Sequence, residues 1–108
     1  MLYYIGVDVK KPKSVIIQGH TYKIISDNSK DCKENLESKE LRGCIKYPEQ
    51  VIYISPDQHD DSWMLTLVHE CVHGFLQHFG YKDNEKLVDN FATAIFTFLS
   101  ENKLWKTK

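Results

Sequence analysis

The chain of 108 residues is long enough for one domain with a single modest hydrophobic core. Hydrophobic residues make up 42%, charged residues 27% and the formal net charge is -1, which argues against a basic surface for direct nucleic-acid binding. No apolar run reaches the roughly 18 residues needed to cross a membrane. The first residues, MLYYIGVDVKK, lack the basic and then apolar order of a secretion signal, so we expect a cytoplasmic protein without a membrane partner.

The first half of the chain predicts short β-strands, because its apolar segments are brief and rich in β-branched and aromatic residues. The expected strands cover residues 3–9, 14–18, 21–25, 41–47 and 51–55. The short polar segment QGH marks a tight turn between the strands at 14–18 and 21–25, and PEQ marks another between the strands at 41–47 and 51–55. Each pair is therefore expected to form an antiparallel hairpin. The polar segment 26–40, with Cys32 and Leu36 as its only apolar residues, is expected to be a solvated loop with one loose helical turn.

After residue 60 the apolar period changes from two to about 3.6, which predicts two helices. The first is expected to be capped within residues 60–62 and to stop at Gly80, and the second to be capped within residues 83–84. The expected buried residues are Met64, Leu65, Val68, Val72, Phe75, Leu76 and Phe79, then Val88, Phe91, Ala92, Ile95, Phe98 and Leu99. Because the connection is short, the helices should form an antiparallel hairpin, which completes an α+β fold.

The first predicted helix contains the motif HECVH, in which His69 and His73 are four residues apart and Glu70 follows the first histidine. At about 100° per residue both imidazoles lie on one flank of the apolar face. Two imidazole nitrogens on successive turns can hold one Zn²⁺, and an adjacent carboxylate can act as general base. The alternative is a buried helix with two ordinary histidines, and the amphipathic context together with carboxylates on the next helix favours the metal.

Two carboxylates on the second predicted helix, Glu85 and Asp89, are candidates for a third zinc ligand. They are four residues apart and share a helix face, so orientation does not separate them. His73 lies roughly 9 Å before the end of the first helix, and in an antiparallel hairpin an equal depth into the second helix is nearer Asp89. Glu85 also has an independent role at the positive end of the helix dipole. The residues therefore favour Asp89, with Glu85 as the alternative, and the unbound carboxylate can orient a histidine.

These motifs resemble the ImmA/IrrE-like metallo-endopeptidases, zincins of the gluzincin type, and especially the short members found in phages and mobile elements. The resemblance rests on TLVHECVHGFL (66–76), LVDNFATAIF (87–96) and, more loosely, LRGCIKYPEQVIYIS (41–55). The family commonly has a glutamate followed by alanine and asparagine, where this chain has Asp89, Ala92 and Thr93. Aspartate is shorter by one methylene group, and a register that begins at Glu85 also fits.

The resemblance implies a single zincin-like metallopeptidase domain over residues 1–108, and a zinc-dependent endopeptidase that hydrolyses peptide bonds of a protein substrate, often a phage or mobile-element repressor. In that mechanism His69, His73 and Asp89 hold Zn²⁺ and Glu70 is the general base. The alternative is a non-catalytic zinc-containing binding module that inactivates a regulator by contact. The two differ in whether Glu70 is needed for function.

A peptidase also needs a strand that aligns the substrate and a donor that stabilises developing negative charge, and the sequence offers several candidates for these roles. The strand at residues 51–54, if it lies at a sheet edge, can align an extended substrate by strand addition. The negative charge that develops on the substrate also needs a hydrogen-bond donor, for which Tyr53, Tyr81 and His78 are candidates. On the helical wheel His78 points away from the histidine pair.

Overall fold

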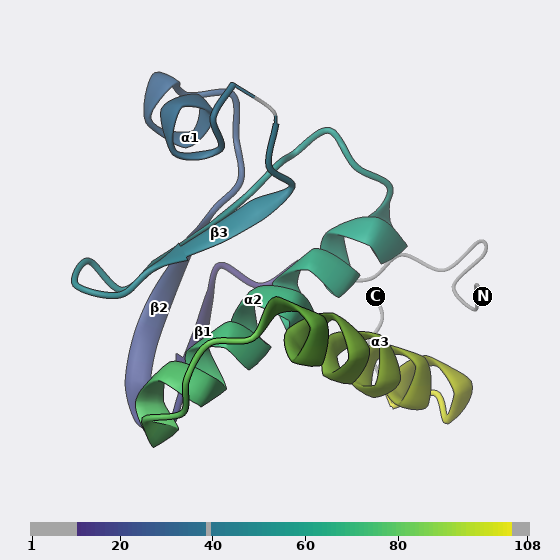
Figure 1. The fold of residues 1–108 in the computed structure, drawn as a ribbon. Helices are drawn as coiled ribbons and strands as arrows, with labels where there is room; N and C mark the ends of the chain where they lie inside the picture. The colour runs from purple at the N-terminus through teal and green to yellow at the C-terminus, as the bar shows by residue number, and fades with distance from the viewer. Residues whose placement is uncertain (1–10, 39, 105–108) are drawn as a thin grey trace.

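In the computed structural model of the protein, residues 11–38 and 40–104 are described, and they form an α+β fold (Figure 1). The elements in chain order are β1 (Ser14–Ile17), β2 (His20–Ile25), α1 (Lys30–Asn35), β3 (Gly43–Lys46), β4 (Val51–Ile54), α2 (Asp60–Phe79) and α3 (Glu85–Glu101). The strand expected over residues 3–9 lies outside the described residues. None of the described helices is both long and apolar enough to span a membrane.

The described strands form one mixed sheet in the order β1-β2-β4-β3. Both predicted hairpins are present, since β1 pairs antiparallel with β2 and β3 pairs antiparallel with β4. The antiparallel arrangement expected for the strands does not extend beyond the hairpins, because β4 lies beside β2 and runs parallel to it. Turn residues specify the two strands that they join, whereas the junction here depends on the crossover through α1 and β3.

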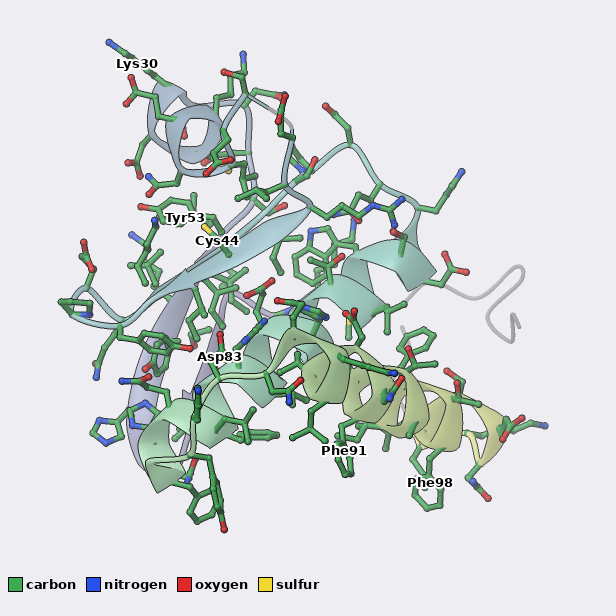
Figure 2. All side chains as sticks on the ribbon, in the orientation of Figure 1. Lys30, Cys44, Tyr53, Asp83, Phe91 and Phe98 are labelled. Carbon is green, nitrogen blue, oxygen red and sulfur yellow. The ribbon has the colours of Figure 1, made fainter. Side chains whose placement is uncertain are left out.

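The polar segment before β3 contains a short helix that covers one face of the sheet. The Ser29 hydroxyl caps α1 by accepting a hydrogen bond of 3.1 Å from the backbone N–H of Cys32. Cys32 and Leu36 are both buried beside Tyr53, whose phenol donates a 3.0 Å hydrogen bond to Asp31 (Figure 2). The helical turn expected within residues 26–40 is confirmed, whereas the expectation of a solvated segment is wrong for Cys32 and Leu36. Two apolar residues four apart gain burial by covering the sheet.

Both long helices begin close to the predicted residues, and α2 also ends where predicted. His59 caps α2 without a side-chain hydrogen bond, so the cap expected within residues 60–62 is wrong. The helix ends as predicted at Gly80, whose φ of 80° is the left-handed conformation that glycine adopts without a steric penalty. Asn84 caps α3, and its side chain accepts a hydrogen bond of 3.0 Å from the N–H of Leu87.

Helix α2 is buried on two sides, because it lies between the sheet and α3 (Figure 1). Trp63 and Leu67 pack against the sheet, and Val72 packs against Val88 of α3. The single apolar face predicted for α2 is therefore incomplete, and Phe79, which was placed on it, is 68% exposed. A 3.6-residue period identifies one apolar face, whereas a helix that is covered from both sides has two.

Helix α3 has a narrower buried face than its sequence predicts. Val88 and Ala92 are buried as expected, and Phe96 is buried in addition. Phe91 and Phe98, expected in the core, are instead exposed and point away from the sheet (Figure 2). Only one side of α3 has a neighbouring element to pack against among the described residues, so a second apolar row on this helix remains in contact with solvent.

Strand β3 passes unusually close to α2 at Gly43. A Cβ atom added to Gly43 would lie 2.6 Å from Cγ2 of Thr66 and 3.3 Å from Oε2 of Glu70. These separations are shorter than van der Waals contact, so only glycine lets the two elements approach this closely. The absence of a side chain at residue 43 thus brings the edge of the sheet directly beside Glu70.

We expect Gly43→Ala to lower the free energy of unfolding by about 1–3 kcal/mol, because the added methyl group overlaps the Thr66 side chain. Urea unfolding of the metal-free protein measures this loss. Thr66→Ser removes the overlapping Cγ2 atom and should restore most of the stability in the double variant, with Thr66→Ser alone as its control. An unchanged unfolding midpoint for Gly43→Ala would show that β3 can move away from α2 freely.

Candidate functional site

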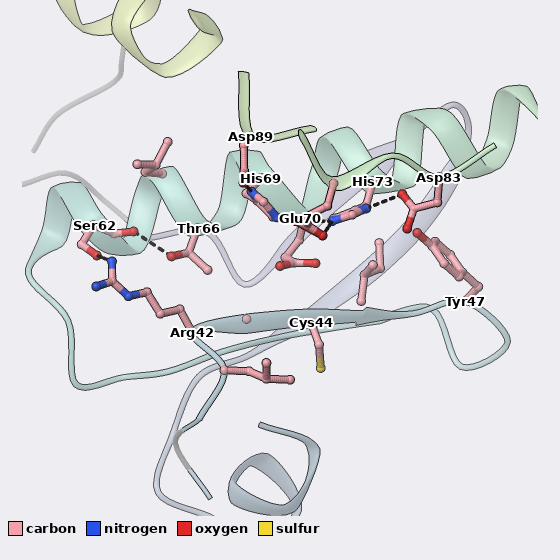
Figure 3. A pocket seen from close by; sticks show the side chains of 15 residues that line it. Arg42, Cys44, Tyr47, Ser62, Thr66, His69, Glu70, His73, Asp83 and Asp89 are labelled. Carbon is pink, nitrogen blue, oxygen red and sulfur yellow. Dashed lines mark hydrogen bonds and ion pairs between the residues drawn. The ribbon is translucent and has the colours of Figure 1, made fainter. Parts of the chain in front are cut away.

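A cleft of about 630 Å³ lies between β3, α2 and the start of α3 (Figure 3). All the residues that the HECVH motif singled out line it, namely His69, Glu70 and His73. Both carboxylates considered as a third ligand, Glu85 and Asp89, line it as well. The fold therefore brings every predicted metal-ligand and general-base residue to one place.

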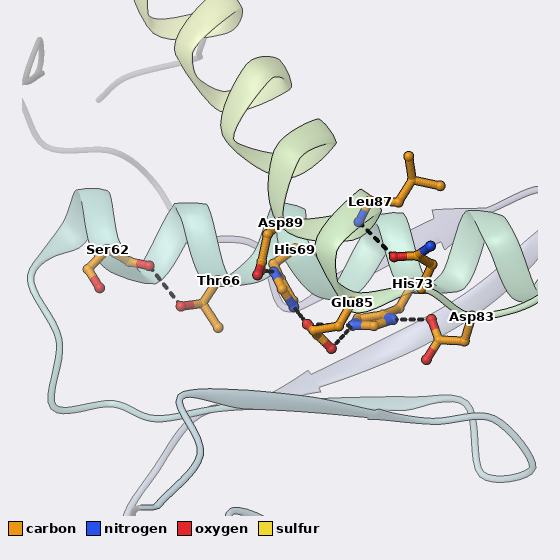
Figure 4. A network of polar contacts seen from close by, with 9 residues as sticks. Ser62, Thr66, His69, His73, Asp83, Glu85, Leu87 and Asp89 are labelled. Atoms are coloured by element: carbon orange, nitrogen blue, oxygen red, sulfur yellow. Dashed lines mark hydrogen bonds and ion pairs between the residues drawn. The ribbon is translucent and has the colours of Figure 1, made fainter.

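The two histidines of the motif converge on one carboxylate. Their ring centroids are 4.9 Å apart, as expected for side chains on successive turns of one helix face. Nε2 of His69 lies 2.7 Å from Oε1 of Glu85, and Nε2 of His73 lies 3.3 Å from Oε2 of Glu85 (Figure 4). Suitable ligand atoms of these three residues all lie within 4.8 Å of one another, so they can share one metal ion.

Each histidine is also held from its opposite nitrogen by a second carboxylate (Figure 4). Nδ1 of His69 lies 3.1 Å from Oδ1 of Asp89, and Nδ1 of His73 lies 2.8 Å from Oδ1 of Asp83. A carboxylate that accepts the Nδ1–H of an imidazole fixes the tautomer whose lone pair is on Nε2. Both lone pairs then point toward Glu85.

This geometry favours Glu85, the alternative ligand, and places Asp89 on the far side of the His69 ring. Asp89 is nearer to His73 in axial depth only if the two helices lie with their axes side by side. In the structure α3 crosses over α2, and its first turn lies above the histidines (Figure 4). The sequence predicts Asp83 only as a helix cap, although its position in the short connection, ten residues after His73, is a signal for a role at this site.

The three donors could hold a metal ion, and their separations can be compared with those around zinc. Around tetrahedral zinc, with bonds of about 2.0–2.1 Å, neighbouring ligand atoms are about 3.3 Å apart. The 3.3 Å separation of His73 Nε2 from Glu85 agrees with this value, whereas the 2.7 Å separation of His69 Nε2 from Glu85 is shorter. The Glu85 side chain is 63% exposed, so it can move the few tenths of an ångström required.

Glu70 is the one acidic residue of the site that is buried, with 6% of its surface exposed. Burial raises its pKa to about 7, and the charges of Glu85 and Asp83 add to the rise while His73 opposes it. Among the described residues the Glu70 carboxylate has no hydrogen-bond or ion-pair partner. A buried and unpaired carboxylate costs free energy, and a cation bound beside it would offset that cost.

We expect the stability of the metal-free protein to fall as the pH rises. A carboxyl group whose folded pKa of about 7 exceeds its unfolded value of about 4.5 stabilises the fold below pH 4.5, and this contribution is lost as the pH rises to 7. The loss is up to about 3 kcal/mol. Burial alone would lower the pKa of His73, but the hydrogen bond to Asp83 and the surrounding carboxylates raise it. A raised histidine pKa also makes the folded protein less stable as the pH rises.

Urea unfolding at pH 5 and pH 8, for the wild type and Glu70→Gln in the presence of a chelator, tests this dependence. Between pH 5 and pH 8 the free energy of unfolding should fall more for the wild type than for Glu70→Gln. Equal pH dependence in both proteins would show that the folded pKa of Glu70 is close to its unfolded value.

The three residues considered as charge-stabilising donors lie elsewhere. Tyr53 is on the α1 side of the sheet, Tyr81 is 68% exposed and outside the cleft, and Nε2 of His78 lies 2.6 Å from the Tyr22 hydroxyl. Tyr47, just after β3, is the tyrosine that lines the cleft (Figure 3). Burial and the nearby charge of Asp83 raise the pKa of Tyr47 to about 12, so its phenol keeps its proton at neutral pH.

Comparisons of the chain with protein-family models, with curated proteins and with solved structures found no match.

Proposed function

We propose that the protein is a small zinc-dependent endopeptidase with a zincin-like site. The observation that carries this proposal is the combination of two Nε2 atoms converging on Glu85 with a buried, unpaired Glu70 carboxylate beside them. His69, His73 and Glu85 would hold the ion, while Asp83 and Asp89 orient the two imidazoles. The ligand set has a net charge of -1 when both histidines are neutral, and this favours a divalent cation.

The residues around the ion have separate tasks in peptide hydrolysis. Zinc, when bound, supplies a Lewis acid that polarises the substrate carbonyl and makes a water molecule more acidic. Glu70 accepts the proton of that water as its oxygen bonds to the carbonyl carbon, and passes the proton to the amine nitrogen as the C–N bond breaks. The Tyr47 phenol can donate a hydrogen bond to the carbonyl oxygen as negative charge develops there.

The sheet offers an edge for an extended peptide, but at a strand other than the one expected. Residues 51–54 form β4, which is paired on both sides and cannot accept another strand. Among the described strands β3 lies at an edge of the sheet, and it borders the cleft beside Glu70. A substrate that adds to β3 by backbone hydrogen bonds would place its peptide bonds next to the proposed general base.

An unfolded or extended segment of a cytoplasmic protein, such as a phage or mobile-element repressor, is the substrate class that the ImmA/IrrE-like resemblance favours. The proposal is tested by digesting a proteome-derived peptide library with the zinc-loaded protein and identifying new termini by mass spectrometry. Cleavage that requires zinc and Glu70 supports a peptidase. If Glu70→Gln still inactivates a regulator as well as the wild type does, the protein is instead a non-catalytic zinc-containing binding module.

A further inference from the structure

The cleft has opposite charges at its two ends. Arg42 is the only arginine or lysine among the described side chains that line it, and it lies at the end near Ser62 (Figure 3). Asp83 and Tyr47 lie at the other end, beyond the histidines (Figure 3). A peptide that lies along the cleft would therefore meet the positive charge of Arg42 on one side of the reacting bond and the negative charge of Asp83 on the other.

Arg42 has a fixed backbone and an available guanidinium group. Its carbonyl oxygen accepts a hydrogen bond of 2.8 Å from the N–H of Ser55, which ties the residue to the start of the sheet. Its guanidinium Nη1 is 3.5 Å from the Ser62 hydroxyl, at the outer limit of a hydrogen bond. In the described part of the chain no carboxylate forms an ion pair with Arg42, so its planar set of donors is open to an anion.

The pairing of β3 with β4 determines which backbone groups face the open edge. The hydrogen bond from Ser55 to Arg42 marks a hydrogen-bonded pair, and such pairs alternate along an antiparallel ladder. Gly43 and Ile45 therefore direct their N–H and C=O groups outward, toward an added strand. An added strand that runs antiparallel to β3 passes Ile45 first, then Gly43 beside Glu70, and then Arg42.

We propose that Arg42 recognises an acidic side chain located one to three residues after the cleaved bond of the substrate. This inference rests on the proposed peptidase function, since it assigns Arg42 a role in substrate selection at the same cleft. A strand advances about 3.3 Å per residue, so the segment just beyond Glu70 comes within reach of a long arginine side chain. An arginine pairs with a carboxylate through two parallel hydrogen bonds, which makes it selective for acidic residues.

The peptide-library digestion measures this selectivity directly. With the wild type, aspartate and glutamate should be enriched about fivefold at one of the first three positions after the cleaved bond. Arg42→Gln should abolish the enrichment and Arg42→Glu should replace it by enrichment of lysine and arginine. Lys46→Gln is the matched control, because Lys46 is a cation on the same strand that does not line the cleft. If the wild type cleaves without acidic enrichment, or if enrichment persists in Arg42→Gln, the inference is overturned while the peptidase proposal stands.

If no peptide is cleaved, that result counts against the peptidase proposal. A binding measurement then still tests whether Arg42 recognises an acidic side chain. Zinc-loaded Glu70→Gln is mixed with decapeptide pools that carry glutamate, glutamine or lysine at one fixed position, and the retained peptides are quantified by mass spectrometry. Retention of the glutamate pool about fivefold over the glutamine pool, lost in Glu70→Gln/Arg42→Gln, supports recognition by Arg42. Equal retention of the pools by both proteins overturns it.

Discussion

Replacing Glu70 by glutamine is expected to lower the rate of peptide cleavage by about 10³-fold, within the range found when a general base is removed. Glutamine has nearly the same shape but cannot accept the proton from water or deliver it to the leaving amine. The variant should bind zinc as the wild type does, because Glu70 is not among the atoms that converge on the proposed ion. The measurement is the initial rate of cleavage for zinc-loaded protein, with zinc content determined on the same samples.

Two controls separate a chemical effect from a loss of fold. Glu101→Gln makes the same change on the exposed end of α3 and should cleave at the wild-type rate. The metal-free Glu70→Gln protein should unfold at higher urea concentration than the wild type at pH 8, because the buried carboxylate has been removed. Cleavage at a near-wild-type rate by a folded Glu70→Gln protein would contradict the proposed role of Glu70.

The second large effect is expected at the third ligand. Glu85→Gln should weaken zinc binding by more than about 100-fold, because it removes the proposed third ligand, whereas Asp89→Asn should weaken it by about 10-fold to 100-fold, because it removes the group proposed to orient His69. Competition with a chromophoric chelator at constant pH measures both affinities. Asp83→Asn, which acts on His73 in the same way as Asp89→Asn acts on His69, should resemble Asp89→Asn.

The ranking of these variants distinguishes the two assignments of the third ligand. Greater loss of affinity in Asp89→Asn than in Glu85→Gln would show that the second helix shifts along α2 when zinc binds, and that Asp89 is the ligand. Asn90→Asp, which adds a carboxylate beside Asp89 on an exposed part of α3, controls for effects of charge alone and should leave the affinity within a few fold.

The sequence predicts the local elements well, because their signals are local. The alternation of apolar residues locates β1, β2, β3 and β4, and the glycine at residue 80 marks the end of α2. The sequence does not predict how the two hairpins join, since the parallel pairing of β2 with β4 depends on the crossover through α1 and β3. It also misplaces Phe91, because a helical period cannot show that only one side of α3 is covered.

The site was predictable to the extent that it lies on one helix. The spacing of His69 and His73 places their rings together, and the structure confirms that they face the same cleft. The choice between Glu85 and Asp89 depends on the crossing of α2 and α3, a relation between two helices that neither helix encodes alone. The contact of Asp83 with His73 could not be predicted for the same reason, because it forms only when the α2–α3 connection is folded.

The most direct test of the account is the metal content of the purified protein. Elemental mass spectrometry would be performed on protein prepared without a metal-binding affinity tag, with wild type and His73→Ala measured side by side. We expect about one zinc ion per wild-type chain and loss of that ion from the variant, because His73 is one of the three proposed ligands in the cleft. No zinc in either protein, even after incubation with the metal, would mean that HECVH is a helical segment with two ordinary histidines and that the peptidase proposal is wrong.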